Sequence, residues 1–207
     1  MPRAAELDLR APGQPWRPVP MNGANLGLDV VPLQSSPGTL SMLARFPVGF
    51  ARLTPGGYAA TEEFLVIEGE LEFEGVRHMP GSLAFIPARF LRTSLVAPGG
   101  CTVLAWWGGP AEFLPADRLV EHVRDGMTAV DVPSAPPGLL LSAGPVTWRR
   151  HLPGDATPSA GADVVDLALT RWHRTSARPP SPDEPFLLRT DPPAESSAPL
   201  LGEDVPP

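Results

Sequence analysis

Residues 56–71 read GGYAATEEFLVIEGEL, and residues 80–88 read PGSLAFIPA. At the end of the first stretch, glutamates at every second position from 68 to 74 alternate with Gly69, Leu71 and Phe73. This period of two is typical of a strand with one face in water and the other in the core. Glycine tolerates a bulge or a sharp bend, so we expect two strands kinked at Gly69.

The sequence on either side has the same β character. Residues 83–86 form a short apolar run ended by Pro87, and side chains over 101–107 alternate between two faces. The chain has 29 Pro and 20 Gly, which disfavour long helices and indicate many short segments joined by turns. We therefore predict an all-β sandwich or jelly roll rather than βαβ units, with one short helix over 116–124.

The two quoted stretches resemble the signature motifs of the cupin superfamily. The resemblance covers residues 40–113 and implies a double-stranded β-helix, the cupin jelly roll. Cupins include enzymes of many kinds, storage proteins and sensors, so the motifs indicate a fold more strongly than a function. Four features are most similar to the ChrR-like anti-sigma-factor cupins: the Glu62-Glu63 doublet, EGEL at 68–71, PGS at 80–82 and Gly100-Cys101.

The same resemblance implies four metal ligands, three of which are missing from this chain. In cupins a His-x-His pair and a glutamate in the first motif, and a histidine after the second, bind the metal. Alignment on Glu62 puts Gly56 and Tyr58 where the pair would stand and Arg92 where the third histidine would stand. A transition metal needs three or four deprotonated donors, and arginine is permanently protonated. We therefore predict no bound metal and no other cofactor.

Glu62 and Arg92 become the main ligand-binding candidates, because in a cupin barrel both would point into the mouth. On one interpretation, Arg92 clamps the carboxylate or enolate of a small molecule through charge-assisted hydrogen bonds. On the other, Glu62 and Arg92 form an internal ion pair that fills the vacated metal site. The sequence leaves both interpretations open.

Tyr58 and His78 are the candidate catalytic residues. A phenol at the barrel mouth can act as a general acid or hold an oxyanion, and it can equally plug the pocket with its ring. His78 would be the natural general base if its ring faced inward; otherwise it is a surface or hydrogen-bonded structural residue. Of the neighbours Trp106 and Trp107, one belongs in the core, and we assign Trp106 to a pocket rim as a ligand-binding candidate.

Composition excludes several classes of function. All 16 basic residues are arginine, so chemistry that needs a lysine Schiff base is excluded. A net charge of -7 argues against a nucleic-acid partner. Cys101 is the single cysteine and is expected to be a buried, inert thiol. No apolar run is long enough to span a membrane, so we expect a cytoplasmic protein without a membrane partner.

We expect four regions along the chain. Residues 1–36 form an extended N-terminal arm, and residues 37–115 form the barrel core. Residues 116–174 faintly repeat the pattern of the core and are predicted to be a partial or degenerate second cupin-like module. Residues 175–207 are rich in proline and poor in bulky side chains, which predicts a disordered tail.

Three functions follow as hypotheses, and the sequence does not decide whether the protein is an enzyme. The first is a metal-free cupin that binds a small anionic or carbonyl-bearing molecule, as a sensor or accessory protein. The second is a metal-independent isomerase, cyclase or dehydratase that uses Tyr58 or His78 with Arg92. The third is a ChrR-like regulatory module that acts through protein contacts. A homodimer is compatible with all three.

Overall fold

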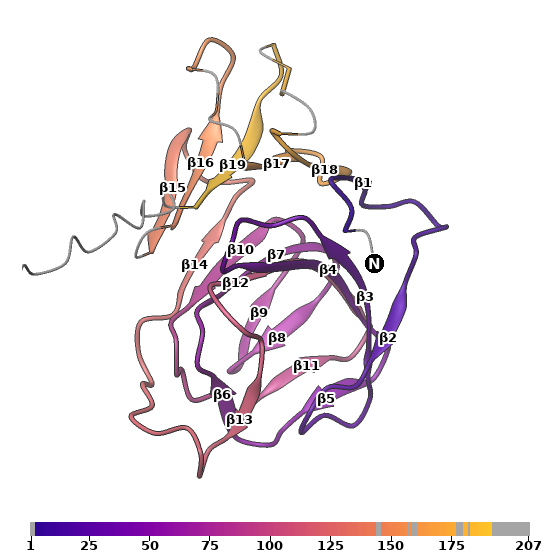
Figure 1. The fold of residues 1–207 in the computed structure, drawn as a ribbon, viewed down its shortest axis with the longest axis vertical. Helices are drawn as coiled ribbons and strands as arrows, with labels where there is room; N and C mark the ends of the chain where they lie inside the picture. The colour runs from indigo at the N-terminus through magenta and orange to yellow at the C-terminus, as the bar shows by residue number, and fades with distance from the viewer. Residues whose placement is uncertain are drawn as a thin grey trace, which may run out of the picture.

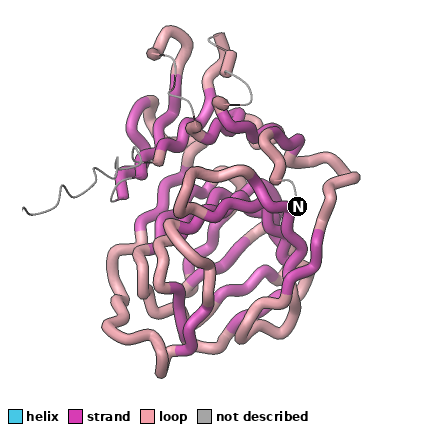
Figure 2. Tube along the Cα trace, in the orientation of Figure 1, coloured by secondary structure: helices cyan, strands magenta, loops and turns pink. Residues whose placement is uncertain are grey.

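The computed structural model describes residues 3–143, 146–156, 158, 161–176, 180–181 and 183–191. Within these ranges the chain consists of strands, turns and loops, without a helix (Figure 2). The prediction of a helix over 116–124 is therefore wrong. A short helix is stable only if it buries an apolar face, and here Leu119 is buried whereas Val120 is 70% exposed.

The described residues form nineteen strands, which pair antiparallel in four sheets and confirm the prediction of an all-β chain. In chain order the strands are β1 (Glu6–Asp8), β2 (Arg17–Val19), β3 (Leu28–Leu33), β4 (Leu40–Phe46), β5 (Phe50–Arg52), β6 (Gly56–Tyr58), β7 (Glu62–Gly69), β8 (Leu71–Phe73), β9 (Val76–His78), β10 (Ser82–Ile86), β11 (Leu95–Ala97), β12 (Cys101–Trp107), β13 (Phe113–Pro115), β14 (Thr128–Asp131), β15 (Gly138–Ala143), β16 (Val146–His151), β17 (Asp163–Asp166), β18 (Arg171–Arg174) and β19 (Phe186–Thr190).

Three of the sheets enclose a barrel (Figure 1). A seven-stranded sheet of order β14-β10-β7-β12-β4-β3-β2 faces the four-stranded sheet β5-β11-β8-β9, and the pair β13-β6 completes the wall. This arrangement confirms the jelly roll expected from the sequence. Aromatic side chains dominate the barrel interior: Phe46, Phe50, Tyr58, Phe64, Phe73, Phe90, Trp107 and Phe113.

Gly69 marks the bend between β7 and β8. Its φ is 78°, in the left-handed region that favours glycine. A Cβ atom at this position would collide with the backbone carbonyl of Gly100. β7 therefore ends at Gly69 and β8 begins at Leu71, which confirms the predicted kink.

The fourth sheet, of order β1-β18-β17-β19-β16-β15, forms a third layer that packs on the outer face of the seven-stranded sheet (Figure 1). β7 serves two cores because its side chains alternate. Phe64 and Val66 point into the barrel, whereas Leu65 and Ile67 pack against the third layer. The seven-stranded sheet is thus buried on both faces.

Buried charges join the barrel to the third layer. Arg189 of β19 binds both carboxylate oxygens of Glu63 in β7, with N–O distances of 2.9 and 3.0 Å. Arg189 also pairs with Asp163 of β17, whose carboxylate accepts a hydrogen bond of 3.2 Å from Arg174. All four side chains are buried. An unpaired buried charge costs several kcal/mol, so these contacts stabilise the way in which the two layers meet.

Three tryptophans complete the hydrogen bonding of the two buried carboxylates. Trp148 donates from Nε1 to Glu63 at 2.6 Å. Trp106 and Trp172 donate to Asp163 at 3.0 and 3.2 Å. Burial, the largest influence, raises the pKa of Asp163 to about 6, although its two arginine partners lower it. We call the four charged residues and three indoles the interlayer network.

The sheets combine strands from different regions of those predicted from the sequence. β1 belongs to the predicted arm but pairs with β18 in the third layer, and β14 lies beyond residue 115 but pairs with β10 in the barrel. The predicted disorder over 175–207 is wrong for β19, a buried strand whose apolar side chains are held between β17 and β16. Residues 192–207 of that tail lie outside the described residues. A degenerate second cupin-like module over 116–174 stays a prediction.

Candidate functional site at the barrel mouth

Backbone pairing brings three of the predicted site residues to one end of the barrel. Glu62 begins β7 and lies opposite Trp107, the last residue of β12. Arg92 exchanges two backbone hydrogen bonds with Gly56, of 2.7 and 3.0 Å, which fix it beside β6. Tyr58 ends β6. Tyr58, Glu62 and Arg92 therefore meet, as the sequence predicted, at what we call the mouth.

Arg92 and Glu62 form an ion pair in the mouth. The Arg92 side chain is 2% exposed and that of Glu62 is 12% exposed, so the cation is buried and the carboxylate reaches toward the surface. The Arg92 guanidinium also lies over the ring of Tyr58, with 4.4 Å from Cζ to the ring centroid. This is a cation–π contact in a desolvated setting, where such contacts are strongest.

Arg52 is a second buried cation in the mouth, and sequence reasoning missed it. It is 1% exposed and donates a hydrogen bond of 3.2 Å from Nη1 to the hydroxyl of Tyr58. Burial is the main cause that lowers the pKa of Arg52, and repulsion from Arg92 acts in the same direction. Within the described part of the chain, no carboxylate forms an ion pair with Arg52.

A signal for Arg52 was present in the sequence. It follows Phe50 by two residues on one short strand, so the alternation of side chains places both on the barrel side. An arginine at an apolar position of a strand is the kind of exception that indicates a site.

Three nitrogen atoms in the mouth have no hydrogen-bond partner among the described residues: Nη2 of Arg52, Nε of Arg92 and Nε1 of Trp107. Arg52 and Arg92 both contact Tyr58, and the ring of Trp107 lies edge-on to it with centroids 6.2 Å apart. All three groups are donors and none can accept. The mouth therefore has three N–H donors available for a hydrogen-bond acceptor.

The position of the first expected metal-binding histidine has no room for a side chain. A Cβ atom on Gly56 would overlap the ring of Phe113 and the carbonyl oxygen of Leu114. Phe113 thus occupies the space that a histidine at position 56 would need. The described residues also contain no group of three or more His, Cys, Asp or Glu side chains placed to hold a metal ion.

His78 lies inside the barrel but apart from the mouth. Its ring packs edge-on against Phe64, with centroids 5.1 Å apart, and its Nε2 has no partner among the described residues. Burial lowers the pKa of His78. The structure therefore does not bring His78 to Tyr58 or Arg92.

Trp106 lies on the opposite face of the seven-stranded sheet from Glu62. It is fully buried and belongs to the interlayer network through Asp163. Its assignment to a pocket rim is corrected, because the strand alternation directs Trp107, not Trp106, to the mouth.

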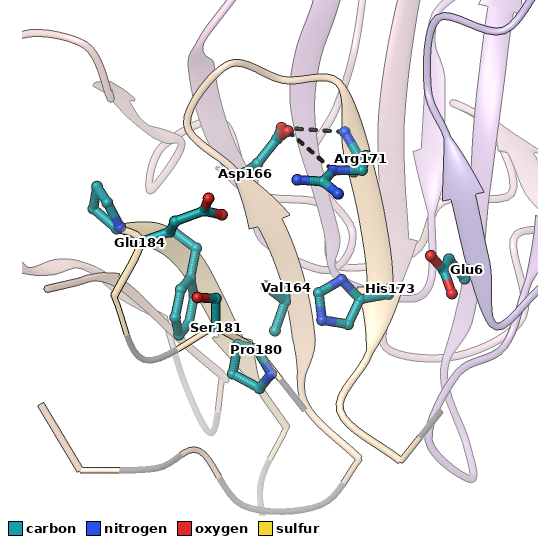
Figure 3. Close-up of a pocket in the computed structure, with 10 residues that line it drawn as sticks. Glu6, Val164, Asp166, Arg171, His173, Pro180, Ser181 and Glu184 are labelled. Carbon is teal, nitrogen blue, oxygen red and sulfur yellow. Dashed lines mark hydrogen bonds and ion pairs between the residues drawn. The ribbon is translucent and has the colours of Figure 1, made fainter. Parts of the chain in front are cut away.

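Two hollows lie away from the mouth. One, of about 60 Å³, lies beside Val164 and Phe186 on the face of the third layer turned away from the barrel, and Figure 3 shows Asp166 next to Arg171 there. Arg171 donates its backbone N–H to that carboxylate at 3.1 Å. The other, of about 300 Å³, borders Cys101, and burial raises the pKa of this thiol to about 12, as expected for an inert cysteine.

Comparison with known proteins supports the fold. No family model matches the sequence, and no curated protein matches it. Among solved structures, a candidate dioxygenase from Nostoc punctiforme aligns with a TM-score of 0.62 and 18% identity over 93% of this chain and 84% of that chain. A cupin superfamily protein from Desulfitobacterium hafniense aligns with a TM-score of 0.33 and 18% identity over 39% of this chain and 75% of that chain. The chain has the cupin fold.

The structural similarity of this chain to ChrR is weaker. The complex of SigE with the anti-sigma factor ChrR from Rhodobacter sphaeroides aligns with a TM-score of 0.39 and 23% identity, over 47% of this chain and 51% of that chain. A particular kinship with ChrR therefore stays a prediction. No helix in the described residues is long and apolar enough to cross a membrane.

Proposed function

We propose that this cupin binds a small organic anion in its mouth without a metal ion. The observation that carries the proposal is the charge of the mouth, where two buried arginines share one carboxylate, that of Glu62, in the part of the chain that the structure describes. A buried cation without a counterion costs free energy. An anion that enters from solution would offset this cost.

The hydrogen-bonding groups without a partner in the mouth are all donors, which supports an anion as the ligand. Arg52, Arg92 and Trp107 each present a spare N–H, and a carboxylate offers acceptors with about four lone-pair directions. A metal cation in the same place would be repelled by two guanidinium groups. The ring of Phe113 beside Gly56 also supports binding without a metal.

The close packing around the mouth favours a small ligand. The barrel interior is packed with aromatic side chains, and Arg52, Arg92 and Tyr58 are all buried. Glu62 is the most exposed of the charged mouth residues, so it marks the side from which a ligand enters. Short carboxylates such as acetate fit these limits.

Binding is favoured over acid–base catalysis because of where His78 lies. A proton-transfer group must be within hydrogen-bond reach of the reacting atom, and His78 packs against Phe64 away from the mouth. An isomerase, cyclase or dehydratase would depend on the Tyr58 hydroxyl alone, held by Arg52. We therefore prefer a role as sensor or accessory protein over a role as an enzyme.

Thermal melting and calorimetry with acetate and acetamide test the proposal, because the two probes have the same shape and differ in charge. We expect acetate to raise the melting temperature of the purified protein and acetamide to leave it unchanged. Arg52→Gln should abolish the effect of acetate. Arg77→Gln, which changes an exposed arginine on β9, should retain it.

Two results would contradict the proposal. One is the absence of any response to acetate and other short carboxylates in the wild type, or an equal response in Arg52→Gln. The other is elemental analysis that finds about one transition metal per chain, lost in Glu62→Ala, since binding would then depend on a metal.

A further inference from the structure

We propose that Glu62 sets the charge of the ligand, so that the mouth selects a monoanion over a dianion of the same shape. The inference rests on the proposed anion binding and adds the charge class of the ligand. It gives Glu62 a role as a specificity-determining residue in a site without a metal.

A count of the charged groups around the mouth supports this role. Arg52 and Arg92 contribute two positive charges, and Glu62 contributes one negative charge. His78 and Cys101 also face the barrel interior, and burial keeps both uncharged near neutral pH because it lowers one pKa and raises the other. The mouth without a ligand therefore carries one excess positive charge.

Glu63, the neighbour of Glu62, does not change this count. Its side chain points to the opposite face of the sheet, where Arg189 binds both of its oxygens. It is also separated from the mouth by the backbone of β7, as expected for consecutive residues of a strand. Its charge is compensated in the interlayer network.

A monoanion in the mouth would balance the charge, whereas a dianion would leave one negative charge in excess. The second negative charge would also lie close to Glu62, with little water to screen the repulsion. At separations of about 5–6 Å and intermediate effective dielectric constants, one such repulsion weakens binding on the order of 10- to 100-fold. Glu62 thus excludes dianions more strongly than it hinders monoanions.

The position of Glu62 strengthens this effect. Its carboxylate is partly exposed while its arginine partner is almost completely buried. A ligand that approaches the two arginines therefore passes the carboxylate first. Because Arg92 is already bound by Glu62, the ligand engages mainly the unpaired donors of Arg52, Arg92 and Trp107.

Malonamide, malonamate and malonate provide a matched series, since they have nearly the same shape and carry zero, one and two negative charges near pH 7.5. Dissociation constants are measured by calorimetry with the full chain. We expect the wild type to bind malonamate about 10-fold or more tightly than malonate and to bind malonamide weakly. In Glu62→Gln the amide oxygen can still accept from Arg92, and malonate should become the preferred ligand.

A double variant separates charge balance from local contacts. Arg52→Gln with Glu62→Gln restores a net charge of one in the mouth, so the preference for malonamate over malonate should return. Glu70→Gln is the matched control, because it removes a carboxylate that pairs with Arg77 on the surface of the barrel. It should leave the wild-type preference unchanged.

The outcomes distinguish this inference from the proposed function. If the wild type binds neither malonamate nor acetate, anion binding itself is refuted. If the wild type binds malonate as tightly as malonamate, or if Glu62→Gln keeps the wild-type preference, the anion site stands and the role of Glu62 is refuted. The wild-type comparison decides the question even if Glu62→Gln fails to fold.

Discussion

Among the residues that the structure describes, buried Arg52 has no carboxylate partner, which is rare for arginine in a folded protein. Its one described hydrogen bond goes to Tyr58, a neutral group that compensates the charge poorly. A side chain placed in this way lowers stability unless a ligand completes its surroundings. We therefore expect Arg52 to lower the stability of the ligand-free protein and to strengthen the binding of an anion in the mouth.

Arg52→Met combined with Tyr58→Phe tests this exchange, because both ends of one hydrogen bond are replaced by apolar groups. The free energy of unfolding of the double variant should equal that of the wild type or exceed it by about 1–3 kcal/mol. Tyr58→Phe alone leaves Nη1 of Arg52 unpaired and should cost about 1 kcal/mol. Urea denaturation in a buffer without carboxylates measures all three proteins. A loss of several kilocalories in the double variant would show that Arg52 is a structural residue.

At the scale of elements, β19 holds the third layer to the barrel. It lies between β17 and β16 and carries Arg189, whose guanidinium reaches Glu63 in β7 and Asp163 in β17. Three strands that are distant in the sequence therefore depend on one side chain. The indoles of the interlayer network add hydrogen bonds but no compensating charge.

Arg189→Met should lower the free energy of unfolding by about 3–5 kcal/mol, because Glu63 and Asp191 lose their cation and Asp163 keeps only Arg174. The comparison is Arg171→Met, which removes an arginine of β18 that is 54% exposed and pairs with Asp166. That surface variant should change stability by less than about 1 kcal/mol. Chemical denaturation followed by tryptophan fluorescence provides the measurement. Equal stabilities of the two variants would mean that the interlayer network contributes little.

The sequence predicted β7, β8, β10 and β12 because each shows its burial through local alternation or a short apolar run. It did not predict β19, whose apolar residues lie among prolines and whose partner Glu63 is 126 residues away from Arg189. The facing of Trp106 and Trp107 depends on the same kind of distant packing, since both faces of β12 are buried. When both faces of a strand are apolar, the local sequence pattern cannot show which side chains face the barrel and which face the third layer.

The same limit applies to the mouth. Tyr58, Glu62 and Arg92 were found because the resemblance supplied their positions, whereas Arg52 lies outside both motifs. The unpaired donors could not be predicted at all, because an unsatisfied hydrogen bond is a property of the folded arrangement.

For the whole molecule, two buried groups give opposite pH dependences. The folded pKa of His78 lies below its ordinary value of 6.5, so the unfolded chain binds more protons and stability falls as the pH drops through 6.5. The folded pKa of Asp163 is raised from 3.8 to about 6, so its contribution rises as the pH falls from 6 toward 3.8.

His78→Gln isolates the first contribution. The variant lacks the titrating imidazole, so the wild type should lose stability relative to it below pH 6.5 and should show no such relative change between pH 7 and 8. Urea denaturation of both proteins at half-unit pH steps gives the difference directly. A pH-independent difference would show that His78 is protonated equally in the folded and unfolded chains.

The pairing of β1 with β18 has a consequence for how the protein is made. The two partner strands, residues 6–8 and residues 171–174, are more than 160 residues apart in the chain, so β18 is synthesised long after β1. Before β15 to β19 have been synthesised, most of the third layer that covers Leu65, Ile67 and Glu63 on the outer side of β7 is missing. A barrel that closes during translation therefore exposes an apolar face with the carboxylate of Glu63 on it until the remaining strands are synthesised. A chaperone would bind the chain most readily at this stage.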